Sequence, residues 1–351
     1  MDQCSLNSLE NYSTMTESTA QEQSTAATTC HSPCTLEADS YENDASYGEA
    51  LSWYSASLTS SVLDYRHENG RRYHGYRDGS YLLPNDESES DRLDMLHELC
   101  LQLLHRRLYL APIKNPERVI DLATGTGIWA IDFGELHPET EVYGCDLSPI
   151  QPTSVPPNVK FLVDDIESDW AYEDDPFDYI HARNLAVSIK DFGSLIKQCY
   201  QSVKPGGWVE FQDWDPYPIS EDGSVEGTGF KQFYDEVYST YEEIGYEVRP
   251  GPKLEQWFKD AGFVNIHVQK FVIPYGVWPK DPHLKNLGAW NQVQAEAAGF
   301  EGLALAALTR YKQWTKDEVI VLTSQVRADG RNRNMHAFFN FFVVYGQRPK
   351  N

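Results

Sequence analysis

Short apolar runs that alternate with segments of helical length constrain the fold of this chain more than any other feature. Five runs of strand length cover residues 118–122, 141–145, 159–163, 177–181 and 208–212. Helix-length segments separate the first two runs and the last two, and such alternation is typical of a mostly parallel, doubly wound α/β sheet. Two further strand candidates follow at 264–272 and 337–345. We therefore expect seven strands, of which the last, at the end of the chain, pairs antiparallel.

Composition sets limits on partners and location. The formal net charge is −24, and because so acidic a surface repels phosphate backbones, we expect no direct binding of nucleic acid. Residues 1–61 contain 21 Ser and Thr, few large aliphatic side chains and no Lys or Arg, which predicts a disordered acidic tail. The chain shows neither a targeting pattern nor an apolar run of the ~18 residues that a membrane span needs. We expect a soluble protein of the cytoplasm, or alternatively of the nucleus.

Two regions follow the tail. Residues 62–112 join a segment rich in Tyr, Arg and Gly to an amphipathic helix that begins near Ser90 and that Pro112 is expected to stop. We expect this region to cap the functional site. The remaining domain, 113–351, carries the predicted sheet, with mainly helical insertions at about 214–250 and 274–335.

The six cysteines favour reduced thiols over a disulfide framework. Cys100, Cys145 and Cys199 fall inside predicted helices or strands, as is usual for thiols in a reducing compartment. Cys30 and Cys34, in the tail, form a single pair without two further ligands nearby in the sequence, so we predict no metal site.

The first strand runs into a glycine turn that opens a helix. There, backbone N–H groups and a helix N-terminus can approach a ligand closely because the side chains are small. The candidate contacts are Asp121, Ala123, Thr124, Gly125, Thr126 and Gly127. Gly125, Gly127 and Ala130 also satisfy the relaxed dinucleotide fingerprint, with Asp146 placed to accept from ribose hydroxyls. A nicotinamide-dependent oxidoreductase is therefore one interpretation.

Acidic residues at the ends of three successive strands favour a different ligand. Asp121 would add a negative charge beside a pyrophosphate, whereas it would attract a cofactor that carries sulfonium and ammonium groups. Asp146 ends the second strand and can accept from ribose hydroxyls, while Leu147 can cover an adenine. The third strand ends in Asp164, Asp165 and Ile166, where a carboxylate can accept from an exocyclic amine. Each acid alone could equally be a helix N-cap, but all three together point to ligand binding.

With these residues the sequence resembles the class I S-adenosylmethionine-dependent methyltransferases. Residues 121–127, DLATGTG, look like their first motif with Ala123 in the place of a glycine, and residues 204–208, KPGGW, look like the turn before their fifth strand. Within that superfamily, the fungal LaeA-like methyltransferases are most similar, through 67–76 (HENGRRYHGY), 127–132 (GIWAID), 146–152 (DLSPIQP) and the terminal strand. The resemblance covers about residue 64 to the C-terminus and leaves the tail outside it.

The resemblance implies S-adenosyl-L-methionine as the cofactor and methyl transfer as the reaction. Residues after the fourth and fifth strands should face the methyl group, which nominates His181 and Arg183, and Asp213 and Trp214. Of these, His181 is the best candidate for a general base because its ordinary pKa of ~6.5 suits neutral pH, although a structural role at a strand end is the stronger alternative. Tyr73, with His74, could fold over the cofactor as a lid or pack on the domain.

The acceptor is less constrained by the sequence. Aromatic residues of the insertions could wall a pocket for a flat or apolar acceptor, although the helical spacing of Phe230, Tyr234, Tyr238 and Tyr241 is also typical of core. We expect a small-molecule methyltransferase of fungal secondary metabolism. The family also contains nuclear regulators of metabolite gene clusters, so a regulator that works through protein partners is the alternative, and a nicotinamide oxidoreductase is the least favoured.

Overall fold

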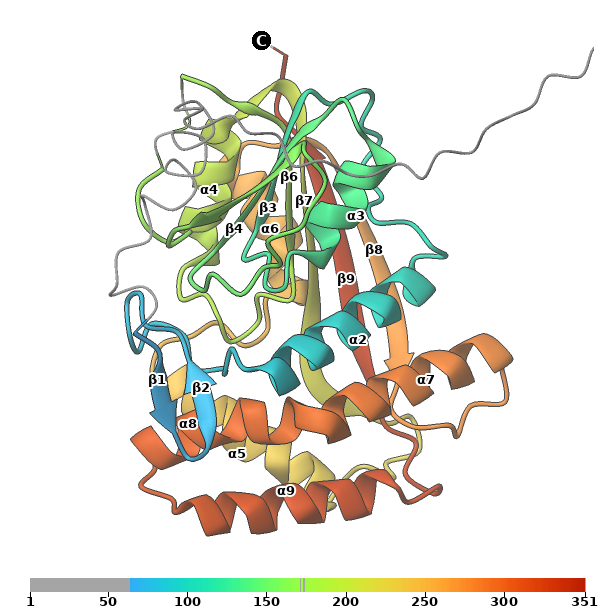
Figure 1. The fold of residues 1–351 in the computed structure, drawn as a ribbon. Helices are drawn as coiled ribbons and strands as arrows, with labels where there is room; N and C mark the ends of the chain where they lie inside the picture. The colour runs from blue at the N-terminus through green and yellow to red at the C-terminus, as the bar shows by residue number, and fades with distance from the viewer. Residues whose placement is uncertain (1–63, 171, 173, 351) are drawn as a thin grey trace, which may run out of the picture. The chain divides into compact units, whose positions relative to one another are not determined.

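A seven-stranded sheet organises the residues described by this computed structural model, which are 64–170, 172 and 174–350. The strands of this sheet are β3 (Arg118–Leu122), β4 (Glu141–Asp146), β5 (Val159–Val163), β6 (Phe177–Arg183), β7 (Val203–Ile219), β8 (Val264–Pro274) and β9 (Phe338–Gln347). Their order is β5-β4-β3-β6-β7-β9-β8 (Figure 1). All seven predicted strands are present, and the predicted tail lies outside the described residues.

Strand direction also follows the prediction. The pairs β3–β4, β4–β5, β3–β6 and β6–β7 are parallel, whereas β9 pairs antiparallel with both β7 and β8. β7 is much longer than the predicted run, because its pairing with β9 continues to Ile219. The mostly parallel sheet with an antiparallel last strand is confirmed.

Helices cover both faces of the sheet. The helices are α2 (Glu87–Leu103), α3 (Ile128–Leu136), α4 (Phe192–Ser202), α5 (Gly229–Glu243), η1 (Gly251–Lys253), α6 (Leu254–Ala261), α7 (Pro282–Gln294), the π-helix η2 (Ala295–Gly299), α8 (Phe300–Tyr311) and α9 (Lys316–Gly330). Val119 of β3 packs in one cluster with Trp129 of α3. The next residue, Ile120, packs in another cluster with Leu195 of α4 and Phe258 of α6. Burial on both faces explains why apolar residues occupy neighbouring positions in β3 and do not alternate with polar ones.

The N-terminal region starts with a small hairpin, β1 (Arg66–Glu68) and β2 (Arg71–Tyr73), and continues into α2. The prediction that α2 continues to Pro112 was wrong, because the helix ends at Leu103. His105 and Arg106 adopt left-handed backbone, with φ of 53° and 64°, and this turns the chain away from the helix axis.

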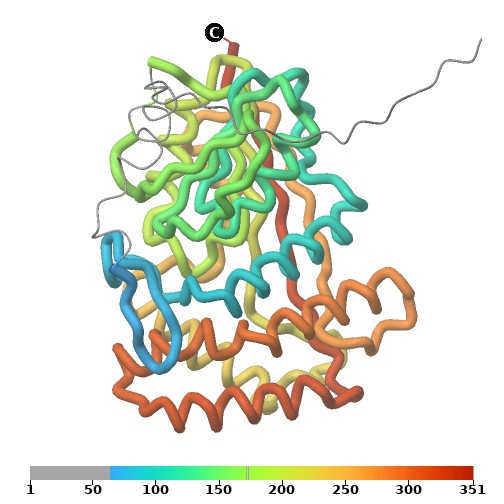
Figure 2. The backbone as a smooth tube through the Cα atoms, viewed as in Figure 1, coloured from blue at the N-terminus to red at the C-terminus, as the bar shows by residue number. Residues whose placement is uncertain are grey.

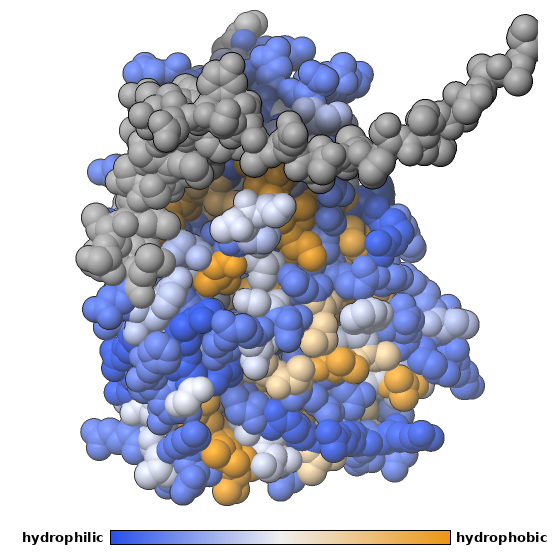
Figure 3. Space-filling view, in the orientation of Figure 1, coloured by the Kyte–Doolittle hydropathy of each residue, from blue (hydrophilic) through white to orange (hydrophobic). Residues whose placement is uncertain are grey.

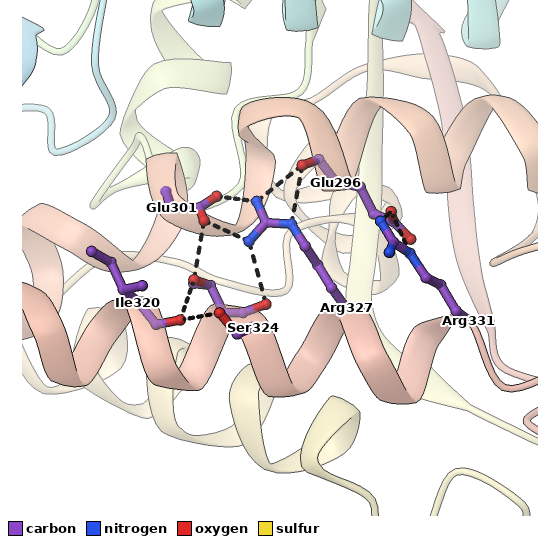
Figure 4. A network of polar contacts seen from close by, with 7 residues as sticks. Glu296, Glu301, Ile320, Ser324, Arg327 and Arg331 are labelled. Carbon is purple, nitrogen blue, oxygen red and sulfur yellow. Dashed lines mark hydrogen bonds and ion pairs between the residues drawn. The ribbon is translucent and has the colours of Figure 1, made fainter.

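The insertions build a second helical layer. Figure 2 shows α2 crossing between the sheet and the helices α7, α8 and α9. The spaced aromatic residues of α5 are core, as the helical spacing allowed: Phe230, Tyr234, Tyr238 and Tyr241 are all buried. Arg327 of α9 and Arg331, the C-cap of this helix, tie α9 to η2 and α8 through Glu296 and Glu301 (Figure 4).

Hydrophilic side chains predominate among the residues coloured in Figure 3. Across the described ranges, the structure has no helix that is long and apolar enough to cross a membrane. Cys100, Cys145 and Cys199 are buried free thiols, whereas the predictions about Cys30 and Cys34 fall outside the described residues.

Candidate active site

A cavity lies at the carboxyl ends of β3, β4, β5 and β6, and its empty volume, open solvent included, is about 1120 Å³. Open α/β sheets bind their ligands at this edge. The cavity brings together most of the residues predicted from the sequence: Asp121, Ala123, Thr124, Gly125, Thr126, Asp146, Leu147, Asp164, Asp165, Ile166 and Arg183. On the opposite side it is closed by Ser80, Tyr81, Pro84, Asn85 and Leu93.

The turn between β3 and α3 has left-handed backbone at alternate positions. The φ angle is 50° at Ala123, 60° at Gly125 and 79° at Gly127. Gly127 is the N-cap of α3, and a Cβ atom there would lie 2.4 Å from the ring of Phe161. Gly127 is therefore required by packing against β5, and it does not line the cavity, whereas Gly125 does.

Asp121 is held from two sides at the end of β3. Its Oδ2 accepts a hydrogen bond of 2.6 Å from the Thr124 hydroxyl, and its Oδ1 lies 2.7 Å from Nδ1 of His181. Burial lowers the pKa of His181, although Asp121 opposes this shift. The neutral imidazole therefore donates through Nδ1 to the carboxylate. His181 is fully buried and stacks on Trp129 at 3.9 Å between ring centroids, so it orients Asp121 from behind.

Arg183, at the end of β6, is held by a histidine that the sequence did not single out. One Nη atom of Arg183 lies 2.8 Å from Nδ1 of His97, and Nε2 of His97 lies 2.9 Å from Asp132. An arginine can only donate, so Nδ1 accepts and the His97 proton sits on Nε2, where it bonds to Asp132. Burial lowers the pKa of His97, with Asp132 opposing this shift and the Arg183 charge reinforcing it. The neutral tautomer is thereby fixed.

Asp146 ends β4 with its carboxylate against the glycine turn. It accepts from the backbone N–H of Gly125 at 2.8 Å and from that of Ser148 at 2.9 Å. Burial raises the pKa of Asp146 to about 6, despite these two hydrogen bonds. A carboxylate so desolvated gains from further hydroxyl donors. Its neighbour Leu147 lines the same cavity.

The third strand end is tied to the N-terminal region. Arg77 forms an ion pair of 3.4 Å with Asp165 and donates to the Ser168 hydroxyl at 2.9 Å. Asp165 also accepts from the backbone N–H of Glu167 at 3.0 Å, in a local turn and not as the helix N-cap that was its alternative role. The side chain thus closes a turn and also lines the cavity.

The structure keeps three other predicted residues away from the cavity lining. Asp213 accepts from the backbone N–H groups of Leu185, Ala186 and Trp214, and burial raises its pKa to about 7. His181 lies behind Asp121. Tyr73 is buried in the helical layer, with the Arg310 guanidinium 4.9 Å from its ring centroid, so it does not form a lid.

Several lining residues escaped the sequence analysis. Tyr81 takes the place expected of Tyr73, eight residues further along the same aromatic segment. Asn85 fixes the cover by donating to the Ser148 hydroxyl at 3.1 Å. Asn184 follows β6 and has φ of 60°. Only the Asn184 position, directly after a strand end, carried a signal that could have been used.

The lining of the cavity is complementary to a cationic ligand that is rich in hydroxyl groups. Asp121, Asp146 and Asp165 present carboxylates along one edge, which suits ammonium, sulfonium, hydroxyl and amine groups and disfavours phosphates. Arg183 adds a cation that suits a ligand carboxylate. Together these residues fit S-adenosylmethionine. Throughout the described chain, no group of three or more His, Cys, Asp or Glu could hold a metal ion.

Comparison with known proteins identifies relatives of the same kind. A family described as Methyltransferase domain matches residues 94–268. The methyltransferase pytC of Aspergillus terreus is 44% identical over 84% of this chain and 91% of its own. The secondary metabolism regulator LAE1 of Cochliobolus heterostrophus is 36% identical over 81% of this chain and 94% of its own. A solved structure of phosphoethanolamine N-methyltransferase 2 from Haemonchus contortus with S-adenosyl-L-methionine is 19% identical, with TM-score 0.42, and covers 74% of this chain and 52% of that one.

The similarity to pytC covers 84% of this chain and so extends well beyond the glycine turn. It therefore decides between the two cofactors that the turn alone allowed, in favour of S-adenosylmethionine. The chain belongs to the class I S-adenosylmethionine-dependent methyltransferases, in a family with the methyltransferase pytC and the secondary metabolism regulators of the LaeA type.

Proposed function

We propose that this methyltransferase acts on a small molecule of fungal secondary metabolism. The observation that carries the proposal is the cover over the cavity, where Tyr81, Asn85 and Leu93 face the strand ends. A site closed in this way suits a small acceptor better than the surface of a folded protein. The 44% identity with pytC, over 91% of that chain, supports an enzymatic role.

Each lining group has an assigned part in this proposal. Asp121 attracts the ammonium and sulfonium end of the cofactor, Asp146 accepts from the ribose hydroxyls and Asp165 from the adenine amine. Arg183, held by His97, takes the cofactor carboxylate. When bound, the cofactor supplies a methyl group on an already activated leaving group, so the protein contributes mainly alignment and exclusion of water.

The two predicted catalytic residues take positioning roles in this proposal. His181 acts through Asp121, to which it donates at 2.7 Å. Asp213 holds the backbone that follows β6 by accepting from Leu185 and Ala186. Neither one lines the cavity, so a reaction that requires a general base there has no support from these two side chains.

Labelled cofactor tests the proposed acceptor class. Purified protein is incubated with S-adenosylmethionine that carries a labelled methyl group and with a small-molecule extract of the producing organism. We expect label in a small molecule, with a boiled-protein control blank. Label found only in protein would contradict a small-molecule acceptor.

A second candidate function is regulation of metabolite gene clusters. The 36% identity with the regulator LAE1 favours it, as does the Ser- and Thr-rich acidic tail. It predicts a nuclear location and changed transcripts of several unrelated clusters after gene deletion. The biosynthetic role predicts a cytoplasmic location and the loss of one methylated product.

A further inference from the structure

A second cavity adjoins the proposed cofactor site, and its empty volume is about 790 Å³. Asn184 lines both cavities, so the two meet at the end of β6. The walls of the second cavity are mostly apolar and aromatic, with Trp214, Tyr234, Phe300 and Phe339 among them. They come from β7, β9 and the helical layer, the region whose function the sequence analysis left open.

Asn184 presents a hydrogen-bond donor where the cavities meet. Its Oδ1 accepts from the indole N–H of Trp214 at 2.8 Å. An indole nitrogen can only donate, so the orientation of the amide is fixed and its NH2 group is left for another partner. A ligand oxygen with a free lone pair fits that position.

Two tyrosine hydroxyls among the residues that line the second cavity also lack partners. Tyr234 and Tyr238 are 7% and 6% exposed, and neither hydroxyl has a hydrogen bond within the part of the chain that the structure describes. Burial raises the pKa of both phenols, so they stay protonated at neutral pH. Each phenol is therefore able to donate a hydrogen bond to a ligand in this cavity.

The charge in the second cavity is already neutralised. Arg92 forms two hydrogen bonds, of 2.9 and 2.6 Å, with the carboxylate of Glu89, which is 1% exposed, and a third of 3.1 Å with Gln294. The described lining of this cavity contains no carboxylate and no imidazole. It therefore offers no general base and does not call for a strongly charged ligand.

Irregular backbone surrounds the same space. Val187 lines the second cavity with φ of 62°, an uncommon conformation for a β-branched residue. Ala295 and Gly299 line it from the π-helix η2. Arg327 stabilises this π-helix from the far side by donating to the Glu296 carbonyl at 2.9 and 3.2 Å (Figure 4). Strained backbone and π-turns concentrate at functional sites.

We propose that the second cavity binds the methyl acceptor, and that the acceptor is a flat, largely apolar molecule whose nucleophile is an acidic enol or phenol oxygen held by Asn184. This inference rests on the proposed small-molecule function. An aliphatic alcohol would need a base that the described lining lacks, whereas an enol or phenol can release its proton to water.

The transfer balances without another reactant. The ionised acceptor oxygen forms the new O–CH3 bond with a lone pair, and the C–S bond breaks with its electrons going to sulfur, which leaves a neutral thioether. The acceptor proton has already passed to solvent.

Binding to the full-length protein with S-adenosylhomocysteine tests the inference. The test ligands are 4-hydroxycoumarin and 2-naphthol, with the aliphatic alcohol 4-chromanol as the comparison, and affinities are measured by calorimetry. Leu303→Trp fills the cavity from α8, while Val321→Trp, on the exposed side of α9, is the size-matched control. Methylation of each ligand is followed by mass spectrometry with S-adenosylmethionine.

We expect the enol and the phenol to bind and be methylated, and 4-chromanol not to be methylated. Leu303→Trp should weaken enol binding by at least about tenfold and Val321→Trp by less than about twofold. S-adenosylhomocysteine should bind both variants as it binds the wild type, which shows that they fold. Enol affinity unchanged in Leu303→Trp, no binding of either flat ligand, or equal methylation of 4-chromanol would overturn the inference.

Asn184→Asp tests the donor separately, because it keeps an acceptor for Trp214 and removes the NH2 group. It should weaken 4-hydroxycoumarin binding by about tenfold or more, and by more than it weakens the binding of S-adenosylhomocysteine, whose cavity Asn184 also lines. Unchanged enol affinity would overturn the role of Asn184. Failure of the wild-type protein to bind S-adenosylhomocysteine would instead contradict the proposed function itself.

Discussion

The hydrogen bonds around His97 fix the position of one proton. Because Arg183 can only donate, Nδ1 of His97 must stay unprotonated to accept at 2.8 Å, and Asp132 takes the proton on Nε2. A second proton on this imidazole would face the Arg183 cation. The state of His97 therefore controls how Arg183 points into the cofactor cavity.

Replacing His97 should weaken cofactor binding without abolishing the fold. In His97→Leu, Arg183 loses a buried acceptor, so S-adenosylhomocysteine affinity should fall by about 1 kcal/mol. Calorimetry measures it, with His283→Leu on the exposed start of α7 as the control. Equal affinity in His97→Leu and wild type would show that Arg183 needs no such support.

Low pH should weaken the binding of S-adenosylhomocysteine through two groups, His97 and Asp146. The pKa of His97 is lowered by burial, so the neutral form persists at neutral pH and is lost as the pH falls well below ~6.5. Asp146, with a pKa raised to about 6, is protonated over a similar range and accepts hydroxyls less well. The affinity of the wild type for S-adenosylhomocysteine should therefore decrease at pH values below 6. The His97→Leu variant should show only the loss of affinity that comes from protonation of Asp146. Identical pH profiles for the variant and the wild type would contradict the role assigned to His97.

Among the secondary-structure elements, α2 links the N-terminal region to both cavities. Its N-cap, Asp86, accepts from the backbone N–H of Glu89 at 3.1 Å. The same carboxylate accepts two hydrogen bonds from Arg71 of β2, at 2.6 and 2.9 Å. One side chain thus fixes the start of the helix and the hairpin in front of it.

Removing the Asp86 carboxylate should destabilise the fold more than removing an ordinary helix cap does. Asp86→Ala should lower the free energy of unfolding by about 2 to 3 kcal/mol, since it loses both the cap and a charged partner. Asp281→Ala removes only the cap of α7 and should cost about 1 kcal/mol. Chemical denaturation measures both variants, and equal losses would show that the Arg71 pair contributes nothing.

Element identity was easier to predict from sequence than element ends or side-chain direction. The strands of the parallel sheet are buried on both faces, and so apolar residues stand at neighbouring positions, as residues 119–120 do in β3. The end of α2 was missed because neither His105 nor Arg106 is a residue that marks left-handed backbone. Tyr73 and Tyr81 were indistinguishable by composition, and only tertiary packing sends the first to the core and the second to the cavity.

In the whole molecule, the acidic surplus has two origins. Residues 1–65 hold ten Asp and Glu and no Lys or Arg, which leaves −14 of the total −24 on the remainder. Part of that remainder is explained by the cavity carboxylates Asp121, Asp146 and Asp165. The alignment with pytC covers 84% of the chain, and the motifs that resemble the LaeA-like methyltransferases begin only after the tail, at His67.

Deleting residues 1–61 should therefore leave cofactor binding intact. We expect the truncated and full-length proteins to bind S-adenosylhomocysteine with the same affinity and to unfold at the same temperature. Calorimetry and thermal denaturation check both. A large loss of affinity on truncation would mean that the tail takes part in the site.

The central claim, that the strand-end carboxylates bind S-adenosylmethionine, is tested most directly by calorimetric titration of wild type and Asp146→Ala with S-adenosylhomocysteine and with NAD. We predict that the wild type binds S-adenosylhomocysteine and not NAD, and that Asp146→Ala weakens binding by about 1 to 3 kcal/mol because ribose hydroxyls lose their charged acceptor. Unchanged affinity in Asp146→Ala, or binding of NAD in place of S-adenosylhomocysteine, would contradict it.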